Sequence, residues 1–336
     1  MQKRLTLFVV FVFTTGALLA PGLHSEAFGF KSSLSAGVGR MDGDLTYKIG
    51  GVFYDSETAG RAPMAISKLE FPLETYMLTV DFGMEFANRW EINITGKTNV
   101  LDSDGVMKDS DYLSLFWDVD EETGEQTGDV STGEELGMPD VYSESDVDLD
   151  AIIGDFNIRY RIVGTLYAGV GYIYQNYDYE MSDFRQWYPL RDYYSLYDSA
   201  YYSPGISGTG VGLTYEITTH IPYLELAAKG NISENFTIGA YFRYSPMVKM
   251  KDEDNHLQRV PPILAQGECD GDAYILALNA KYKFARRWFL DFQFDYTKID
   301  TKGDQKNYTE GTYAWTTDEE ISSTQMFYSL SLGFSF

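Results

Sequence analysis

Hydrophobic and polar residues alternate along much of this chain with the two-residue period of a β-strand. The pattern is clearest over 326–336, where mostly Ser and Gly occupy one face and the other face carries Met326, Tyr328, Leu330, Leu332, Phe334 and Phe336. The same alternation recurs over 90–96, 155–162 and 289–296. A soluble β-sandwich would turn a polar face outward, whereas these aromatic-rich faces are equally typical of a lipid-facing wall whose polar side chains line a lumen.

Turn residues and polar connections divide the chain into ten expected strands. Short turns lie at 87–89, 163–164, 233–235 and 285–287. Long polar connections lie at about 54–62, 106–146, 181–210, 252–270 and 302–322. The strands between them cover about 31–53, 63–85, 90–105, 147–162, 165–180, 211–230, 236–251, 271–284, 288–301 and 324–336.

An even number of strands with short and long connections in alternation is what a closed membrane barrel requires, because closure leaves no unpaired backbone edge in lipid. We therefore predict an all-β fold, a ten-stranded antiparallel up-and-down transmembrane β-barrel with long extracellular loops. Several segments exceed the roughly 9–11 residues that cross the hydrocarbon. We expect these strands to project beyond the outer leaflet as a tall rim, with both chain termini on the periplasmic side.

The first residues are typical of a secretory signal peptide. A basic start, Met1-Gln2-Lys3-Arg4, precedes an apolar run over 5–20 and the helix-breaking pair Pro21-Gly22. Cleavage near Ser25-Glu26-Ala27 would divide the chain into a signal peptide at 1–27 and a barrel domain at 28–336. An uncleaved anchor helix is the alternative, although a full span takes about 20 apolar residues.

Composition narrows the classes of function. The 50 acidic and 26 basic residues give a net charge of -24, yet 16% aromatic residues is too many for the disordered chains that such acidity usually marks. The sign of the charge excludes a nucleic-acid partner. The single Cys269 excludes a disulfide framework and a thiolate zinc site, and we expect no metal.

Two groups of polar residues fall on the expected extracellular rim. Asp109 and Asp111 alternate at the end of the third strand, so both would point into the barrel mouth. Asp254 and His256 lie in the connection at 252–270, on the same side of the membrane. A solvated run of charge is the ordinary explanation of such a loop taken alone. Their joint occurrence on opposite rims places an Asp–His pair across the mouth from two carboxylates.

At these residues the chain resembles the omptin family, the outer-membrane aspartyl-type endopeptidases of Gram-negative bacteria. The window from Gly105 to Tyr112 follows the family's Gly-x-Met-x-Asp-x-Asp-aromatic pattern. The window from Tyr244 to His256 follows Tyr-Ser-x-x-Val-x-x-x-Asp-x-Asp-x-His. The Pro222-Tyr223 pair and the ten strands also agree, and the similarity extends weakly over the whole mature chain.

The resemblance implies an outer-membrane protease whose active site faces the extracellular side and whose nucleophile is water. Asp109 and Asp111 would be the first catalytic pair, and Asp254 with His256 the second. His256 would act as the general base, Asp254 would fix its tautomer, and Asp109 would hold the same water from the opposite side. Asp111 would be the more dispensable partner.

The family favours a basic residue before the scissile bond, and this gives the expected substrates. Asp252 falls on one acidic substrate-binding position, and Asp44 falls near another. A negative field would also steer cationic peptides toward the mouth. We therefore expect cleavage of peptides and proteins beside Arg or Lys. For the acidic stretch at 117–150, simple solvation and binding of divalent ions is an equal alternative.

The chain also departs from the family. Family activity depends on lipopolysaccharide bound by a basic and aromatic cluster on the outer wall, and the matching stretches at 172–176 and 218–220 lack the expected Arg and Glu. Lipopolysaccharide therefore stays open as an activator, and we expect no other cofactor and a monomer. The third long loop is rich in Tyr, which suits an interfacial girdle or a cover over the cleft.

The alternative from another class is a non-enzymatic outer-membrane barrel that serves as an adhesin or a structural protein. A porin is disfavoured because ten strands enclose a narrow lumen.

Overall fold

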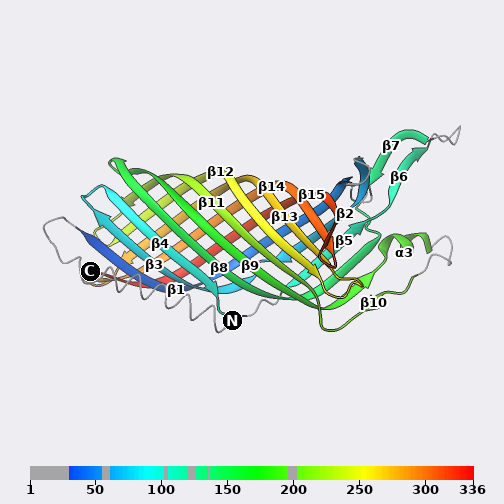
Figure 1. Cartoon of the computed structure of the whole chain (residues 1–336). Helices are drawn as coiled ribbons and strands as arrows, with labels where there is room; N and C mark the ends of the chain where they lie inside the picture. Colours follow the sequence, from blue (N-terminus) through cyan, green and yellow to red (C-terminus); the bar gives the residue numbers. More distant parts are fainter. Residues whose placement is uncertain are drawn as a thin grey trace.

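The alternating segments pair into one closed antiparallel ring, seen side-on in Figure 1. The computed structural model describes residues 30–54, 61–101, 105–119, 126–132, 134, 137–195 and 203–336. The expected signal peptide lies outside these residues. The first and last strands pair along most of their length, beginning at Ser33 opposite Ser335, and this pairing closes the barrel.

Ten strand positions make up the ring in its described part, because β2 and β3 follow one another along one side of it, as do β4 and β5. The strands are β1 (Lys31–Tyr54), β2 (Arg61–Pro72), β3 (Thr75–Phe86), β4 (Trp90–Asn99), β5 (Val106–Tyr112), β8 (Val141–Val163), β9 (Leu166–Trp187), β11 (Val211–Asn231), β12 (Phe236–His256), β13 (Ile263–Lys283), β14 (Trp288–Thr309) and β15 (Thr312–Ser335). The predicted ten-stranded antiparallel barrel is therefore confirmed.

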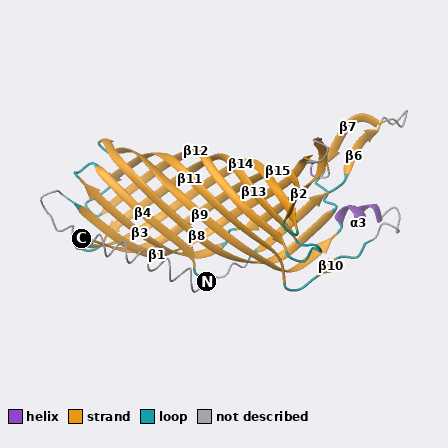
Figure 2. Ribbon diagram, in the orientation of Figure 1, coloured by secondary structure: helices purple, strands orange, loops and turns teal. Residues whose placement is uncertain are grey.

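Elements outside the ring gather at one end of the barrel (Figures 1 and 2). A separate hairpin joins β6 (Leu115–Val119) to β7 (Gln126–Thr132), α3 (Pro189–Ser195) follows β9, and β10 (Ile206–Ser207) pairs with β9. The short turns and the C-terminus lie at the opposite end. Among the described residues, no helix has both the length and the apolar character that crossing a membrane would take.

The strands are longer than the sequence pattern indicated. β12 continues to His256, and β14 and β15 are joined by the short turn Glu310–Gly311. The expected connections at 252–270 and 302–322 are therefore mostly strand, and only 257–262 and 310–311 connect. Apolar alternation does not mark these strand ends, because their outer faces carry many charges and their inner faces mix small and polar residues such as Gly267, Gln305 and Glu319.

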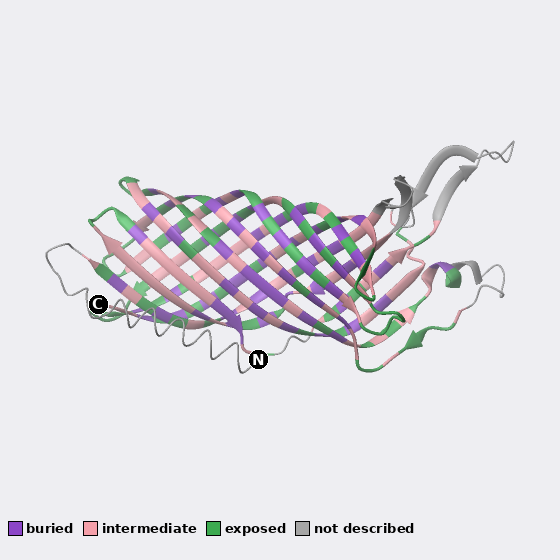
Figure 3. Ribbon diagram, viewed as in Figure 1, coloured by how far each residue is buried: buried purple, intermediate pink, exposed green. Residues whose placement is uncertain are grey.

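The outer wall changes character along its height. Near the short turns it is apolar, with exposed side chains such as Leu226, Phe242 and Leu276 side by side on β11, β12 and β13. Nearer the other end it is charged, with Lys251 and Glu268 exposed on β12 and β13. Figure 3 shows buried and exposed residues in alternation along each strand, as inward and outward side chains require. The long strands thus project beyond an apolar band as a solvated rim.

One irregularity in β12 decides which residues face the lumen of this rim. Between Ser245 and Val248 the strand advances three residues while β13 advances two, from Ala273 to Gly271. The register with β11 shows the same single extra residue in β12. Such a bulge moves the following side chains to the opposite face. In β12, odd-numbered residues point inward up to Ser245, below the bulge on the side of the short turns. Even-numbered residues point inward from Val248 onward, above the bulge on the side of the rim.

Side chains fill the lumen near the middle of the barrel. The rings of Phe71, Tyr179 and Tyr215 pack together, with the ring centroids of Phe71 and Tyr215 4.7 Å apart, and the Tyr47 ring lies 5.2 Å from that of Tyr215. All four rings are fully buried. On the side of the short turns lies a charged cavity of about 1020 Å³. Its wall includes Arg243, which donates hydrogen bonds to Glu225 and Asp155.

Candidate active site

The Asp–His pair lies on one strand and faces the lumen. Asp254 and His256 occupy alternate positions at the end of β12, so their side chains share a face. The Nε2 atom of His256 lies 3.1 Å from Oδ2 of Asp254, a distance at which a protonated imidazole forms an ion pair. Asp254 is buried, whereas the imidazole keeps a quarter of its surface exposed. The His256 imidazole therefore has the Asp254 carboxylate on its inner side and remains accessible on the side of the barrel mouth.

The two carboxylates of the third expected strand come from β5, on another part of the ring. Asp109 and Asp111 alternate there, and Ser67 of the neighbouring β2 donates a 3.5 Å hydrogen bond to Oδ1 of Asp109. Asp109 and Asp254 are near enough for the charge of Asp254 to act on Asp109. The structure therefore brings the two predicted groups together at one end of the lumen.

The surroundings of Asp109 favour its neutral form. The residue belongs to the projecting rim, outside the apolar band. Burial, followed by the negative charges of Asp111 and Asp254, raises the pKa of Asp109 to about 8. The positive charge of Arg259 and the Ser67 hydrogen bond act in the opposite direction. Asp109 thus holds its proton at neutral pH and can donate a hydrogen bond.

Asp252 and Asp44, the two expected substrate-binding carboxylates, are not together. Asp252 lies two residues before Asp254 on β12 and is buried in the lumen. Asp44 is exposed, because the lumen-facing positions of this part of β1 are taken by the buried residues Leu45 and Tyr47. The expectation for Asp44 is therefore corrected. Its main-chain carbonyl accepts a hydrogen bond from Ser323, and its side chain lies on the outer face.

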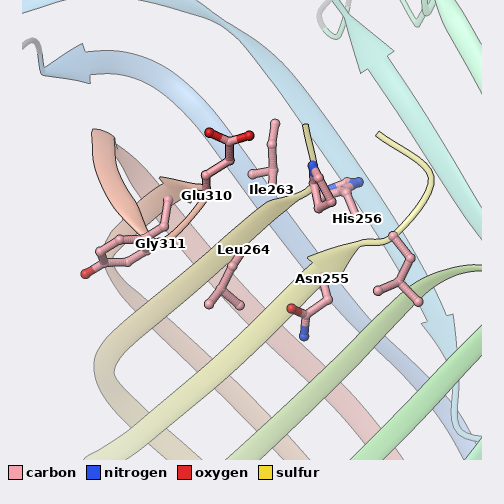
Figure 4. Close-up of a pocket in the computed structure, with 9 residues that line it drawn as sticks. Asn255, His256, Ile263, Leu264, Glu310 and Gly311 are labelled. Atoms are coloured by element: carbon pink, nitrogen blue, oxygen red, sulfur yellow. The ribbon is translucent and has the colours of Figure 1, made fainter. Parts of the chain in front are cut away.

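A hollow of about 210 Å³ opens beside His256. Figure 4 shows it between the ends of β12 and β13 and the turn after β14, with His256, Ile263, Leu264 and Glu310 around it. The hollow leaves space on one side of the imidazole at the barrel mouth.

Sequence reasoning missed two charged residues near this site. Glu319 of β15 is buried, and Arg259 of the connection after β12 acts on the charge of Asp109. Glu319 stands in an acidic run with Asp318 and Glu320 that reads as solvated. Its odd-numbered position, in step with the inward residues of the last strand, was the signal that could have placed it in the lumen.

The described residues of this site do not form a set of metal ligands. Across the residues that the structure describes, no group of three His, Cys, Asp or Glu side chains is placed to hold a metal ion. Of the predicted site residues, His256 lines the hollow at the mouth, where its imidazole can bind and polarise water, and Asp254 lies buried beneath it.

Comparisons with known proteins identify the family and support the barrel fold. The model of the Omptin family matches residues 31–336. A search of curated proteins gives no match. Among solved structures, the chain is similar to the outer membrane protease OmpT from Escherichia coli, with 17% identity, a TM-score of 0.69, and coverage of 93% of this chain and 99% of that chain.

Two further solved structures align with the chain at lower TM-scores. The translocator domain of the autotransporter NalP from Neisseria meningitidis aligns over 98% of this chain and 97% of that chain at 9% identity and a TM-score of 0.37. The P. putida toluene transporter TodX aligns over 91% of this chain and 90% of that chain at 9% identity and a TM-score of 0.33.

Proposed function

Because this chain belongs to the omptin family, and so to the outer-membrane proteases, we propose that it is an endopeptidase that cleaves beside basic residues from the extracellular side. The observation that carries the proposal is the buried Asp254 carboxylate 3.1 Å from His256, with Asp109 across the lumen. The side chains of Asp109 and His256 do not point outward toward lipid. An outward orientation of either one would favour a non-enzymatic barrel.

In this proposal His256 is the general base. With Nε2 directed at Asp254, Nδ1 is the nitrogen left to accept a proton from water. Asp254 would hold the ring in that tautomer and stabilise the imidazolium after proton transfer. The activated water would then attack the scissile carbonyl carbon. The proton taken by the imidazole would pass to the leaving amine, so that His256 ends each cycle neutral.

Asp109 would act from the opposite side of the substrate. A carboxyl group with a pKa of about 8 is neutral at pH 7, so it can donate a hydrogen bond to the water or to the oxygen of the scissile carbonyl. Negative charge develops on that oxygen in the transition state, and a donor placed there stabilises it. Asp111 would support this role through its charge, which helps to keep Asp109 protonated.

The proposed substrates are peptides and proteins with basic residues. Asp252 lies on the inward face of β12, below the Asp254–His256 dyad, and supplies a carboxyl group where a cationic side chain could end. A barrel mouth rich in carboxylates would also raise the local concentration of cationic peptides. We expect the monomer to carry out the reaction without a cofactor.

Lipopolysaccharide remains a candidate activator. The matching outer-wall stretches carry aromatic and imidazole groups instead of the expected charges, and Tyr172 contacts Nδ1 of His220 at 2.5 Å. Adding lipopolysaccharide to a cleavage assay tests this directly. We expect activity without it, and an absolute requirement would contradict that expectation.

Substrate choice provides the first experiment. Two fluorogenic peptides that differ only in Arg or Glu at the residue before the cleaved bond are given to refolded protein, and kcat/KM is measured for each. We expect cleavage of the Arg peptide at that bond and a loss of at least about 10-fold with Glu, since a charged hydrogen bond contributes about 1.5–3 kcal/mol. Equal cleavage of both peptides would reject the proposed specificity.

A further inference from the structure

A second buried carboxyl group lies directly beside Asp252. Glu319 reaches into the lumen from β15, and Asp252 reaches in from β12. Both meet above Gly267 of β13, where an added Cβ would collide with Oε2 of Glu319 and with Oδ1 of Asp252. The two side chains are almost completely buried, at 1% and 6% exposure. The glycine leaves room for two acidic side chains at one point.

The groups around this pair are neutral or acidic. The Cys269 thiol donates to Oε2 of Glu319 at 3.2 Å, and the Gln305 amide donates to Oε1 at 3.4 Å. Both oxygens of Asp252 lack a hydrogen-bond donor among the described residues. The titratable groups that face the pair come from four strands and are Tyr47, Tyr215, Asp254 and Cys269. Asp304 of β14 adds a negative charge to the surroundings of Glu319 from an exposed position on the outer face.

Two adjacent buried carboxylates cannot both stay ionised without a cation. In the free protein one shared proton can satisfy them, because a protonated carboxyl donates to its ionised neighbour. Burial and then the charge of Glu319 raise the pKa of Asp252 well above its ordinary value, and burial raises the pKa of Glu319 to about 7. The pair therefore retains a proton up to about neutral pH.

The pair is also placed to meet a substrate side chain. Asp252, Asp254 and His256 share the inward face of β12, and two residues of a strand advance about 7 Å. The pair thus lies one step below Asp254 and two below His256. Tyr47 and Tyr215, whose ring centroids are 5.2 Å apart, stand beside it. Aromatic faces beside carboxylates suit a long cationic side chain, and a guanidinium most of all.

We propose that Asp252 and Glu319 together form the floor of the specificity pocket, and that an arginine side chain enters it by displacing the proton that the pair shares. The inference rests on the proposed function and names Glu319 as a specificity-determining residue. On binding, one O–H bond is broken, the proton passes to solvent, and the guanidinium takes its place between two carboxylates. Arginine is preferred over lysine, because its planar fork can donate to both groups.

Three matched peptides test the pocket: one with Arg before the cleaved bond, one with Lys, and one with citrulline, the neutral analogue of Arg. For the parent protein we expect kcat/KM for the Arg peptide to increase about tenfold for each unit by which the pH is raised toward neutrality, because binding releases one proton. Glu319→Gln should lower kcat/KM for Arg by about 10- to 100-fold, mainly through KM, and leave citrulline unaffected. It should also flatten the pH dependence that Arg shows relative to citrulline.

Glu320→Gln is the control, because Glu320 is the next residue along β15, is exposed, and pairs with Lys302 on the outer face. It should keep the parental preference and pH profile. Folding of each variant is checked by the shift in electrophoretic mobility on heating.

A binding measurement separates the pocket from catalysis. An Arg-terminated product peptide is titrated calorimetrically into the His256→Ala protein, with and without Glu319→Gln, in buffers of different ionisation enthalpy. We expect release of about one proton per peptide near pH 6, and none with Glu319→Gln. If the parent cleaves beside Arg but Glu319→Gln keeps its Arg preference and proton release, the inference is overturned and the proposed function stands. No cleavage of any peptide by the parent would overturn both.

Discussion

At the scale of single residues, the site combines an Asp–His pair with a carboxyl group whose pKa is raised by its surroundings. Asp254 lies against an imidazole that can take up positive charge, whereas Asp109 lies near two other carboxylates and is mostly desolvated. An imidazole that accepts a proton and a carboxyl group that keeps one can act as base and acid at the same pH. Their positions, more than their residue types, therefore assign their roles.

The proton on Asp109 gives a prediction about pH. Its pKa is raised, so the neutral donor persists up to about pH 8 and is lost above it. We expect kcat to fall as the pH rises through about 8, and we expect Asp109→Asn, which cannot ionise, to be slower but to lack this alkaline decline. Rates measured from pH 6 to 10 decide the point. A parental profile that stays level to pH 10, or an Asn variant with the same decline, would contradict the assignment.

Residue spacing alone identified Asp109, Asp111, Asp254 and His256 as one group, because alternate positions on two strands needed only the correct topology to meet. Asp44 and Glu319 could not be assigned in this way. One lies on the outer face of β1 and the other lies on the inner face of β15. Near Asp44 the apolar residues Leu45 and Tyr47 face the lumen instead of lipid, so apolar character does not tell the inner face from the outer face there. At Glu319 only the alternation of the last strand, continued through a charged run, marks the inner face.

At the scale of elements, the bulge in β12 orients the site. Below it, Tyr241 and Arg243 point inward, and above it Asp252, Asp254 and His256 do. An uninterrupted strand would turn those three side chains toward the outside. Proline cannot donate to the strand ladder and is found at such irregularities, and Pro246 occupies this one. That proline was the only mark of the bulge in the sequence.

Removing the extra residue of the bulge should therefore remove activity. Deletion of Met247 restores an even register and turns His256 outward, so we expect a loss of peptide cleavage together with a lower yield of folded barrel. Met247→Ala, which keeps the bulge, is the control and should remain active. A deletion variant that folds and cleaves at the parental rate would show that the bulge does not orient the dyad.

At the scale of the whole molecule, the aromatic and acidic residues occupy different places. Apolar side chains form the outer band, aromatic rings fill the middle of the lumen, and many of the carboxylates lie on the projecting rim. The strand order and the ring closure followed from alternation and from the sequence of short and long connections. The height of the rim did not, because solvated strand ends look like loops.

The outer band predicts a position-dependent cost of charge. Leu226 lies in it with 62% exposure, beside Phe242, so Leu226→Arg should destabilise the barrel by about 2–4 kcal/mol in a bilayer. Glu216→Arg, on the rim of the same strand, should change stability by less than about 1 kcal/mol. Equilibrium unfolding in lipid vesicles measures both. Equal effects at the two positions would contradict the division between band and rim.

The most direct test of the proposed chemistry is the turnover number of His256→Ala on the Arg peptide, measured beside the parent protein and Glu253→Gln. Glu253 lies between Asp252 and Asp254 on the outer face of the same strand, so its variant should cleave at the parental rate. Loss of the general base should lower kcat by about 10²- to 10⁴-fold while the barrel remains folded. A folded His256→Ala protein that cleaves as fast as the parent would show that the imidazole does not activate the water.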